Sequence, residues 1–233
     1  MNFSKEFDDV KGSVVQVFSF DRNTKTVETG SGVVIGNGTY VLTCAHCVRH
    51  GEINYVTFSG DTQPFFGFIK WIDEKSDVAI LSFNQAIGKG ATVGKSSSVK
   101  IGNETFVVGF PMHINEITAM SANIASFAPF EAYDLIRIDS SVNHGNSGGP
   151  MFDSDGKLLG IVTAKHGKLS KFLEQAQKGH YGVTINVSGF DVVEIFRRLI
   201  KEMGENLNLG IGYVIPIDFI VKNAQEIFEY QEN

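Results

Sequence analysis

Short runs of hydrophobic residues alternate with polar ones along most of the chain, which is the pattern of half-buried β-strands. Turn-forming residues separate these runs, and Gly36-Asn37-Gly38 and Asp155-Gly156 each predict a tight hairpin. Many short strands joined by such turns predict an all-β antiparallel barrel or sandwich rather than βαβ units. The predicted strands cover residues 13–20, 32–35, 39–43, 53–58, 65–72, 77–83, 104–110, 116–127, 134–138, 149–152 and 157–164.

Helical periodicity is found at both ends of the chain. Residues 4–10 place three hydrophobic side chains on one side, and residues 190–203 and a segment from about 218 each form a longer amphipathic pattern. No long linker separates independent domains, so we expect residues 1–233 to form one domain. The inward positions are predicted to be Phe3, Phe7 and Val10; then Val193, Phe196, Leu199, Ile200 and Met203; and finally Ile220, Val221, Ala224, Ile227 and Phe228.

Composition narrows the class of protein. The 233 residues are 42% hydrophobic and carry a net charge of −6, which argues against disorder and against nucleic-acid binding. No stretch has the roughly 20 apolar residues of a membrane span, and the N-terminus lacks a signal-peptide pattern. The two cysteines, Cys44 and Cys47, are too close in sequence to link distant parts of a fold. We therefore expect no membrane association, a reducing compartment and a cytoplasmic location.

Three short segments carry the candidate chemistry. His46 follows a predicted strand, Asp77 opens another, and Ser147 lies in the glycine-rich run Gly145-Asn146-Ser147-Gly148-Gly149-Pro150. Alone, each has an ordinary structural explanation: a loop histidine, a capping acid and a turn. Together, the order His, Asp, Ser is one of the chain orders in which catalytic triads occur.

With these segments the chain resembles the chymotrypsin-like (trypsin-like) serine peptidases, and looks most like their HtrA, or Do-like, branch without a PDZ domain. The resemblance extends over GSGVVIGNGTYVLTCAHCV, DVAIL, VVGFP, NHGNSGGPMFDSDGKLLGIVTA and GIGYVIPID. It implies a double six-stranded antiparallel β-barrel, with barrels over about 12–100 and 101–216. It also implies a helical insertion at about 167–209 and a C-terminal helix over about 217–233.

The resemblance also implies a serine endopeptidase acting on polypeptides, with no metal or organic cofactor. Ser147 would be the nucleophile, His46 the general base and Asp77 its orienting acid. The N–H groups of Gly145 and Ser147 would form the oxyanion hole, and Thr163 would support Asp77. We expect the Ser147 side chain to be exposed.

Primary specificity is predicted from the same resemblance. Ser141, with Val142 beside it, would form the base of the substrate pocket, and Thr163, Ala164 and Lys165 would form its wall. No carboxylate stands at the base, so a buried substrate Arg or Lys would be unpaired and excluded. The Lys165 stem would narrow the pocket toward Val, Ala, Ile or Leu, although its ammonium group could instead attract an acidic side chain.

Other interpretations stay open at this point. The serine run also fits the G-x-S-x-G elbow of α/β-hydrolases, but a hairpin follows it rather than a helix. Cys44 and Cys47 with His46 or His50 could bind a metal, although a second, distant pair of ligands is absent. A latent or gated protease-like sensor that awaits a partner is the non-enzyme alternative.

Two departures from the family pattern stand out. Ser31 stands where digestive relatives have a cysteine that pairs with the counterpart of Cys47, which supports a reducing compartment. The insertion at about 167–209 either covers the second barrel or forms a lid or docking surface for an activating protein partner. The oligomeric state is left open.

Overall fold

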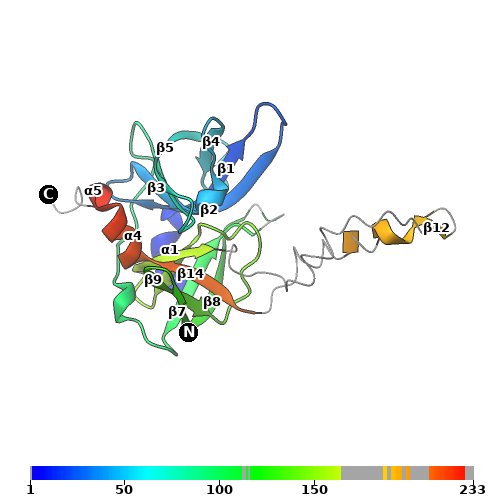
Figure 1. Cartoon of the computed structure of the whole chain (residues 1–233). Helices are drawn as coiled ribbons and strands as arrows, with labels where there is room; N and C mark the ends of the chain where they lie inside the picture. Colours follow the sequence, from blue (N-terminus) through cyan, green and yellow to red (C-terminus); the bar gives the residue numbers. More distant parts are fainter. Residues whose placement is uncertain are drawn as a thin grey trace.

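The computed structural model describes residues 2–111, 114, 116–163, 186–187, 190–195, 198–199 and 210–228. Two closed β-barrels form most of this part of the chain, and Figure 1 shows them one above the other. The double six-stranded antiparallel barrel predicted from the sequence is confirmed.

The first barrel closes in the strand order β1-β2-β3-β6-β5-β4. Its strands are rich in Val and Ile, which suit a pleated surface with one face buried. Strand β2 begins at Val27, five residues before the predicted run, because it pairs with β1 along the whole length of that strand. The strands are β1 (Val14–Phe20), β2 (Val27–Ile35), β3 (Tyr40–Thr43), β4 (Ile53–Thr57), β5 (Phe65–Asp73) and β6 (Val78–Ser82).

The second barrel closes in the order β10-β11-β14-β9-β8-β7. Its last strand in sequence, β14, lies between β9 and β11 and pairs with both. The GIGYVIP segment therefore completes this barrel. The strands are β7 (Glu104–Gly109), β8 (Thr118–Phe130), β9 (Tyr133–Ile138), β10 (Pro150–Asp153), β11 (Leu158–Thr163) and β14 (Gly212–Pro216).

One hydrophobic cluster joins the barrels. It contains core residues of the first barrel, such as Val33 and Leu42, together with Phe106, Ile161 and Ile215 of the second. A smaller cluster fills the rest of the second barrel. Since burial of an Ile or Phe side chain contributes about 1.5–3 kcal/mol, this shared core fixes the barrels against each other.

Short helices flank the barrels. Helix α1 (Ser4–Val10) begins after Phe3, whose ring stacks on Phe106 at 4.7 Å between centroids. The predicted C-terminal helix is divided at Ala224 into α4 (Ile217–Asn223) and α5 (Gln225–Phe228). The other short elements are η1 (Lys11–Ser13), η2 (Ala45–Cys47), η3 (Ser96–Ser98), β12 (Asn186–Val187) and β13 (Phe190–Asp191).

The two amphipathic segments predicted near the C-terminus differ in the burial of their hydrophobic positions. Ile220, Ala224, Ile227 and Phe228 are buried as expected, and Val221 is half-buried. In the 190–203 segment, residues 190–191 are strand and residues 192–195 and 198–199 are helical. Leu199 is 49% exposed, so it does not face a core. The other predicted inward positions, Phe196, Ile200 and Met203, lie outside the described residues.

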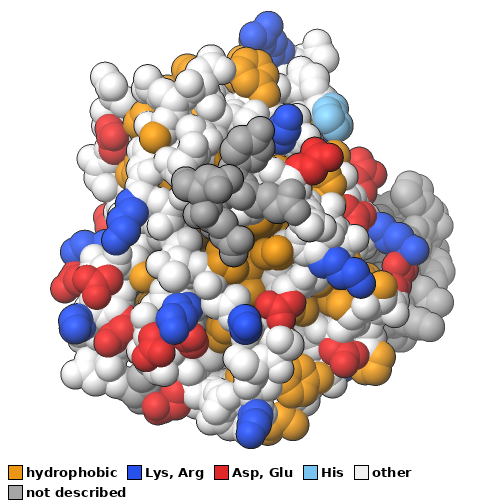
Figure 2. All heavy atoms as spheres, turned by 90° about the vertical axis from the view of Figure 1, so that its left-hand side faces the viewer, with side chains coloured by type: hydrophobic (Ala, Val, Ile, Leu, Met, Phe, Trp, Pro, Cys, Tyr) orange, Lys and Arg blue, Asp and Glu red, His pale blue; other side chains and the backbone are white. Residues whose placement is uncertain are grey.

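Figure 2 shows the face that carries α4 and α5, where hydrophobic side chains lie between charged side chains of both signs. No helix among the described residues is long and apolar enough to cross a membrane.

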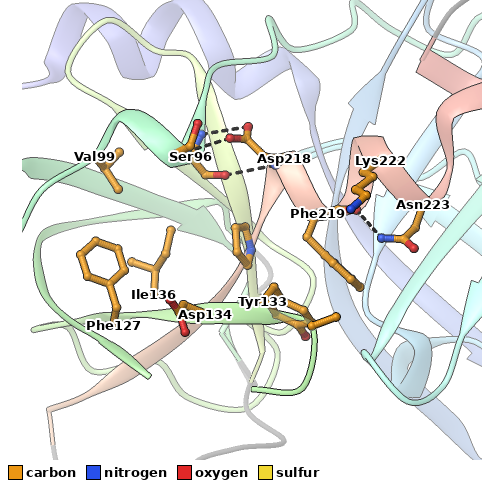
Figure 3. A pocket seen from close by; sticks show the side chains of 13 residues that line it. Ser96, Val99, Phe127, Tyr133, Asp134, Ile136, Asp218, Phe219, Lys222 and Asn223 are labelled. Carbon is orange, nitrogen blue, oxygen red and sulfur yellow. Dashed lines mark hydrogen bonds between the residues drawn. The ribbon is translucent and has the colours of Figure 1, made fainter. Parts of the chain in front are cut away.

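Asp218 joins the C-terminal helices to the segment between the barrels. Its carboxylate accepts hydrogen bonds from the backbone N–H groups of Ser96 (3.1 Å) and Ser97 (2.8 Å). The Asp218 N–H in turn donates to Ser96 Oγ at 3.1 Å. Figure 3 shows these bonds at one end of a cavity of about 470 Å³, in which Phe219 stacks on Tyr133 at 4.0 Å between centroids. Burial opposes the charge on Asp218, but the serine hydrogen bonds outweigh it and lower its pKa below the ordinary 3.8.

We expect Asp218→Asn to lower the free energy of unfolding by about 1–2 kcal/mol, because two backbone donors lose a charged acceptor. A depressed carboxyl pKa contributes stability above its unfolded value, and that contribution is lost as the pH falls through the folded pKa. The difference in the free energy of unfolding between wild type and variant should therefore be largest at pH 7 and decrease below about pH 4. Urea unfolding across this pH range measures it. Asp8→Asn removes one partner of an exposed pair with Lys11 and is the matched control. It should lower the free energy of unfolding by less than about 0.5 kcal/mol. Equal losses of unfolding free energy in both variants would contradict the role of Asp218.

Candidate active site

His46 lies in a single turn of 3₁₀ helix that follows β3. The Cys47 N–H donates to the Cys44 carbonyl at 3.1 Å and closes this turn. Both cysteines are buried, whereas the His46 side chain between them is 38% exposed. The turn therefore presents the imidazole toward solvent while its two neighbours anchor it in the core.

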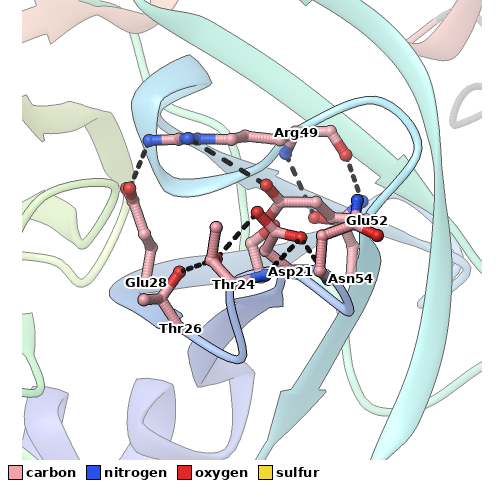
Figure 4. Close-up of polar contacts among 9 residues, drawn as sticks. Asp21, Thr24, Thr26, Glu28, Arg49, Glu52 and Asn54 are labelled. Atoms are coloured by element: carbon pink, nitrogen blue, oxygen red, sulfur yellow. Dashed lines mark hydrogen bonds and ion pairs between the residues drawn. The ribbon is translucent and has the colours of Figure 1, made fainter.

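The loop after His46 is held by a surface network, shown in Figure 4. The Arg49 guanidinium donates to Glu28 of β2 and pairs with Glu52 at 4.0 Å, and Glu52 accepts from Ser19 Oγ at 2.5 Å. Asn54 bonds both the N–H (3.3 Å) and the carbonyl (3.0 Å) of Arg49. Exposed ion pairs of this kind stabilise little on their own, but together these contacts fix the loop against β1 and β2.

Asp77 stands directly before β6 with a φ of 60°, a left-handed conformation that is uncommon for a residue other than glycine. Its side chain is fully buried and faces His46: Nδ1 lies 2.9 Å from each carboxylate oxygen. The His46 N–H also donates to Asp77 at 3.1 Å, and Thr163 Oγ1 donates at 2.7 Å. Donors from both barrels thus surround the carboxylate, which explains why the unusual backbone conformation is retained.

These contacts favour the charged form of both partners. Burial would raise the pKa of Asp77, but the hydrogen bonds from His46 and Thr163 outweigh it and lower that pKa. Burial would lower the pKa of His46, but the hydrogen bond with Asp77 reverses the effect and raises that pKa above 6.5. The pair consequently suits an imidazole that must accept a proton and be stabilised as imidazolium.

Ser147 lies in a loop whose shape depends on glycine. Gly145 and Gly148 have φ values of 91° and 82°, and a Cβ at Gly148 would approach the Ser31 carbonyl oxygen to 2.2 Å. The Gly148 N–H donates to the Val162 carbonyl of β11 at 2.8 Å. Position 148 requires glycine, because any other residue would be strained at this positive φ and its Cβ would clash with the first barrel.

The first barrel contacts this loop directly. The Ser147 carbonyl accepts from the Ser31 N–H at 2.8 Å, and the Cys47 thiol lies 3.6 Å from it. Ser31 Oγ donates to the Gly145 carbonyl at 2.7 Å and accepts from the Phe110 N–H at 2.8 Å. Ser147 is thereby held beside the residue that follows His46. The structure thus gives Ser31 a part in positioning this loop. The prediction that Ser31 stands opposite Cys47 is wrong, because Gly30 faces the Cys47 sulfur, and a Cβ there would lie 2.4 Å from Sγ.

Ser147 is only 2% exposed, so the expectation of an exposed serine is wrong. The physical reason is the close packing of its loop against Ser31 and Cys47. The N–H of Gly145 donates in none of the hydrogen bonds between described residues, and its role in an oxyanion hole stays a prediction.

The predicted substrate-binding residues are placed differently from one another. Ser141 is exposed, whereas Val142 packs in the core of the second barrel against Gly212. The Thr163 side chain is 1% exposed and donates to Asp77, so it supports the acid as expected, and its place in the pocket wall stays a prediction. Ala164 and Lys165 lie outside the described residues, as does most of the 167–209 segment, so the predicted pocket wall and activating partner stay predictions.

Among the described residues, one group of side chains has the composition of a metal site. Cys44, His46 and Asp77 place their donor atoms within 4.8 Å of one another, whereas the sequence interpretation combined Cys44 and Cys47 with His46 or His50. A metal ion at this place would compete with the hydrogen bond between His46 and Asp77.

Comparison with known proteins agrees with this geometry. Residues 30–161 match the trypsin-like peptidase domain. The chain is 34% identical over 168 residues, 63% of its length, to an HtrA-like serine protease of Staphylococcus epidermidis. It is 33% identical over 156 residues, 59% of its length, to one of Staphylococcus aureus. These matches span only 28% and 20% of the relatives, which are much longer proteins.

Among solved structures, an HtrA-type protease, AlgW with tripeptide, superposes with a TM-score of 0.70 at 20% identity, covering 99% of this chain and 64% of that one. At this identity the superposition supports the fold. The domain match over residues 30–161 shows that the chain belongs to the trypsin-like peptidase family, and HtrA-like serine proteases are among its relatives.

Proposed function

We propose that the chain is a serine endopeptidase that uses Ser147 as nucleophile, His46 as general base and Asp77 as the acid that orients His46. The observation that carries this proposal is the buried Asp77 carboxylate, bonded to His46 Nδ1 at 2.9 Å and supported by Thr163 at 2.7 Å. The loop of Ser147 is fixed next to the same turn by Ser31 and Cys47.

The chemistry follows from these positions. His46 takes the proton of Ser147 Oγ as the oxygen attacks the peptide carbonyl, and Asp77 stabilises the resulting imidazolium. The N–H groups of Gly145 and Ser147 bind the oxyanion, a contribution of about 3 kcal/mol per donor. His46 then protonates the leaving amine, and a water molecule, activated by the same histidine, hydrolyses the acyl-enzyme. No metal or cofactor is needed for these steps.

One observation favours a second candidate, a latent or gated form that requires a partner. The Ser147 side chain is 2% exposed, so a substrate or partner would have to widen access to it. A fluorophosphonate that reacts with activated serine separates the two cases: an open enzyme is labelled without additions, and a gated one only with an activating peptide or protein.

We expect Ser147→Ala to lower peptide hydrolysis at least about 10³-fold, since members of a triad act as one unit. Fluorophosphonate labelling should be lost with it, while circular dichroism and the melting temperature stay close to wild type because one hydroxyl is removed. Ser154→Ala, at an exposed serine outside the predicted site, serves as the matched control and should keep its labelling. Wild-type turnover in Ser147→Ala would disprove the assignment.

The raised pKa of His46 has a measurable consequence. A base must be unprotonated, so activity should rise with pH, and the midpoint of that rise should lie above 6.5. Removing the charge of Asp77 in Asp77→Asn should lower the rate by about 10⁴-fold and move the midpoint to lower pH. The profile of kcat/KM between pH 5 and 11 measures both effects, because the pKa of His46 is raised to about 10. His50→Gln, at an exposed histidine, should leave the midpoint unchanged, and a flat wild-type profile would rule out His46 as the base.

We further propose that the enzyme cleaves after small or medium aliphatic residues and not after Arg or Lys. Ser141 brings no charge to the predicted pocket base, so a buried cation would be unpaired at a cost of several kcal/mol. In a peptide library, cleavage after Val, Ala, Ile or Leu should exceed cleavage after Arg or Lys at least about 100-fold. Ser141→Asp should recover part of the cleavage after basic residues. Efficient cleavage after Arg by the wild type would refute this specificity.

A further inference from the structure

Two cysteines flank the predicted base in the sequence Cys44-Ala45-His46-Cys47. Both are free thiols and both are buried, with exposures of 0% and 1%. A turn closed by the hydrogen bond from the Cys47 N–H to the Cys44 carbonyl keeps the two Cα atoms within about 7 Å. Disulfides span Cα separations of about 4.4–6.8 Å, so the backbone already brings the two cysteines into this range.

Each thiol also links the His46 turn to the second barrel. Cys44 Sγ donates to the Val162 carbonyl at 3.2 Å, and Cys47 Sγ donates to the Ser147 carbonyl at 3.6 Å. The Val162 carbonyl is also the acceptor for the Gly148 N–H. The two sulfur atoms therefore contact the segment that holds the nucleophile from both of its sides.

The two thiols differ in acidity. The neighbouring Cys44 side chain, and after it His46, lower the pKa of Cys47. Burial raises the pKa of Cys44. Cys47 is thus the more acidic of the two thiols, and the thiolate is the form that reacts with oxidants.

No other sulfur partner exists for either residue. The chain contains two cysteines, and the first-barrel residue that faces the Cys47 sulfur is Gly30, where an added Cβ would lie 2.4 Å from Sγ. A cross-barrel disulfide is therefore excluded, and oxidation of Cys47 can be resolved within the chain only by Cys44.

We propose that Cys44 and Cys47 are an oxidative modification site, at which hydrogen peroxide forms a reversible disulfide that disables the neighbouring His46–Ser147 site; the regulatory part rests on the proposed function. The Cys47 thiolate attacks peroxide, giving a sulfenic acid and hydroxide. The Cys44 sulfur then displaces the sulfenic oxygen, whose hydroxide leaves with the Cys44 proton as water. Overall the two sulfurs lose two electrons, peroxide gains them, and two water molecules form.

The disulfide changes the active site because it removes both thiol donors. The carbonyls of Val162 and Ser147 lose their S–H contacts, and the sulfurs must turn toward each other across the turn that carries His46. A disulfide is reduced by thiol exchange, so an added dithiol can reverse the change.

The test uses the whole purified chain in three states: reduced, treated with hydrogen peroxide, and treated with peroxide followed by dithiothreitol. Mass spectrometry should find the peptide with both cysteines lighter by the mass of a hydrogen molecule. The rate of fluorophosphonate labelling should fall at least tenfold and recover with dithiothreitol. The NMR titration of the His46 imidazole should shift its midpoint, while that of His50 should not.

Two variants locate the effect. Cys47→Ala should lose the peroxide response, because the remaining Cys44 thiol is the less acidic one; Cys47→Ser replaces it if it fails to fold. Cys44→Ala should form no intrachain disulfide. A missing disulfide in the wild type, or a disulfide that leaves both labelling and the His46 titration unchanged, overturns the proposal. A reduced chain that is never labelled but whose His46 midpoint shifts on oxidation supports the modification site while refuting the proposed peptidase function.

Discussion

A buried carboxylate at the junction of two barrels is the interaction on which the rest of the site depends. Asp77 belongs to the first barrel, and one of its donors, Thr163, belongs to the second. A buried charge without partners would cost several kcal/mol, so the native arrangement of the barrels is the one in which all these donors are present. The same requirement holds Asp77 at a positive φ and orients His46.

The nucleophile loop is held through its backbone carbonyl groups, which accept hydrogen bonds from side chains of the first barrel. Ser31, Thr43 and Cys47 all contribute, since Ser31 and Cys47 bond the carbonyls of Gly145 and Ser147, and Thr43 Oγ1 donates to the Ser31 carbonyl at 2.7 Å. Such side-chain-to-backbone bonds tie the nucleophile loop to the first barrel without a disulfide. They are weaker than a covalent link, but they act together with the hydrophobic cluster that spans both barrels.

Much of the fold could be predicted from the sequence because its signals are local. The alternation of hydrophobic and polar residues predicts the strands, and the Asn-Gly and Asp-Gly pairs predict the turns. The glycine-rich run around Ser147 identifies its loop. What depends on distant parts of the chain could not be predicted in this way. The burial of Ser147, the bonds of Ser31 and the strained backbone of Asp77 all arise where the second barrel meets the first. The division of the C-terminal helix at Ala224 likewise has no marker such as Gly or Pro in the sequence.

The position of β14 has a consequence for the chain while the ribosome is still synthesising it. Because β14 lies between β9 and β11, the second barrel cannot close until the ribosome has released residues 212–216 from its exit tunnel. The strand that carries Thr163 has no partner on that side until then, so a nascent chain holds His46 and Ser147 without a fixed geometry between them. In the proposed peptidase, the site therefore becomes competent only after β14 has left the tunnel and paired with β9 and β11.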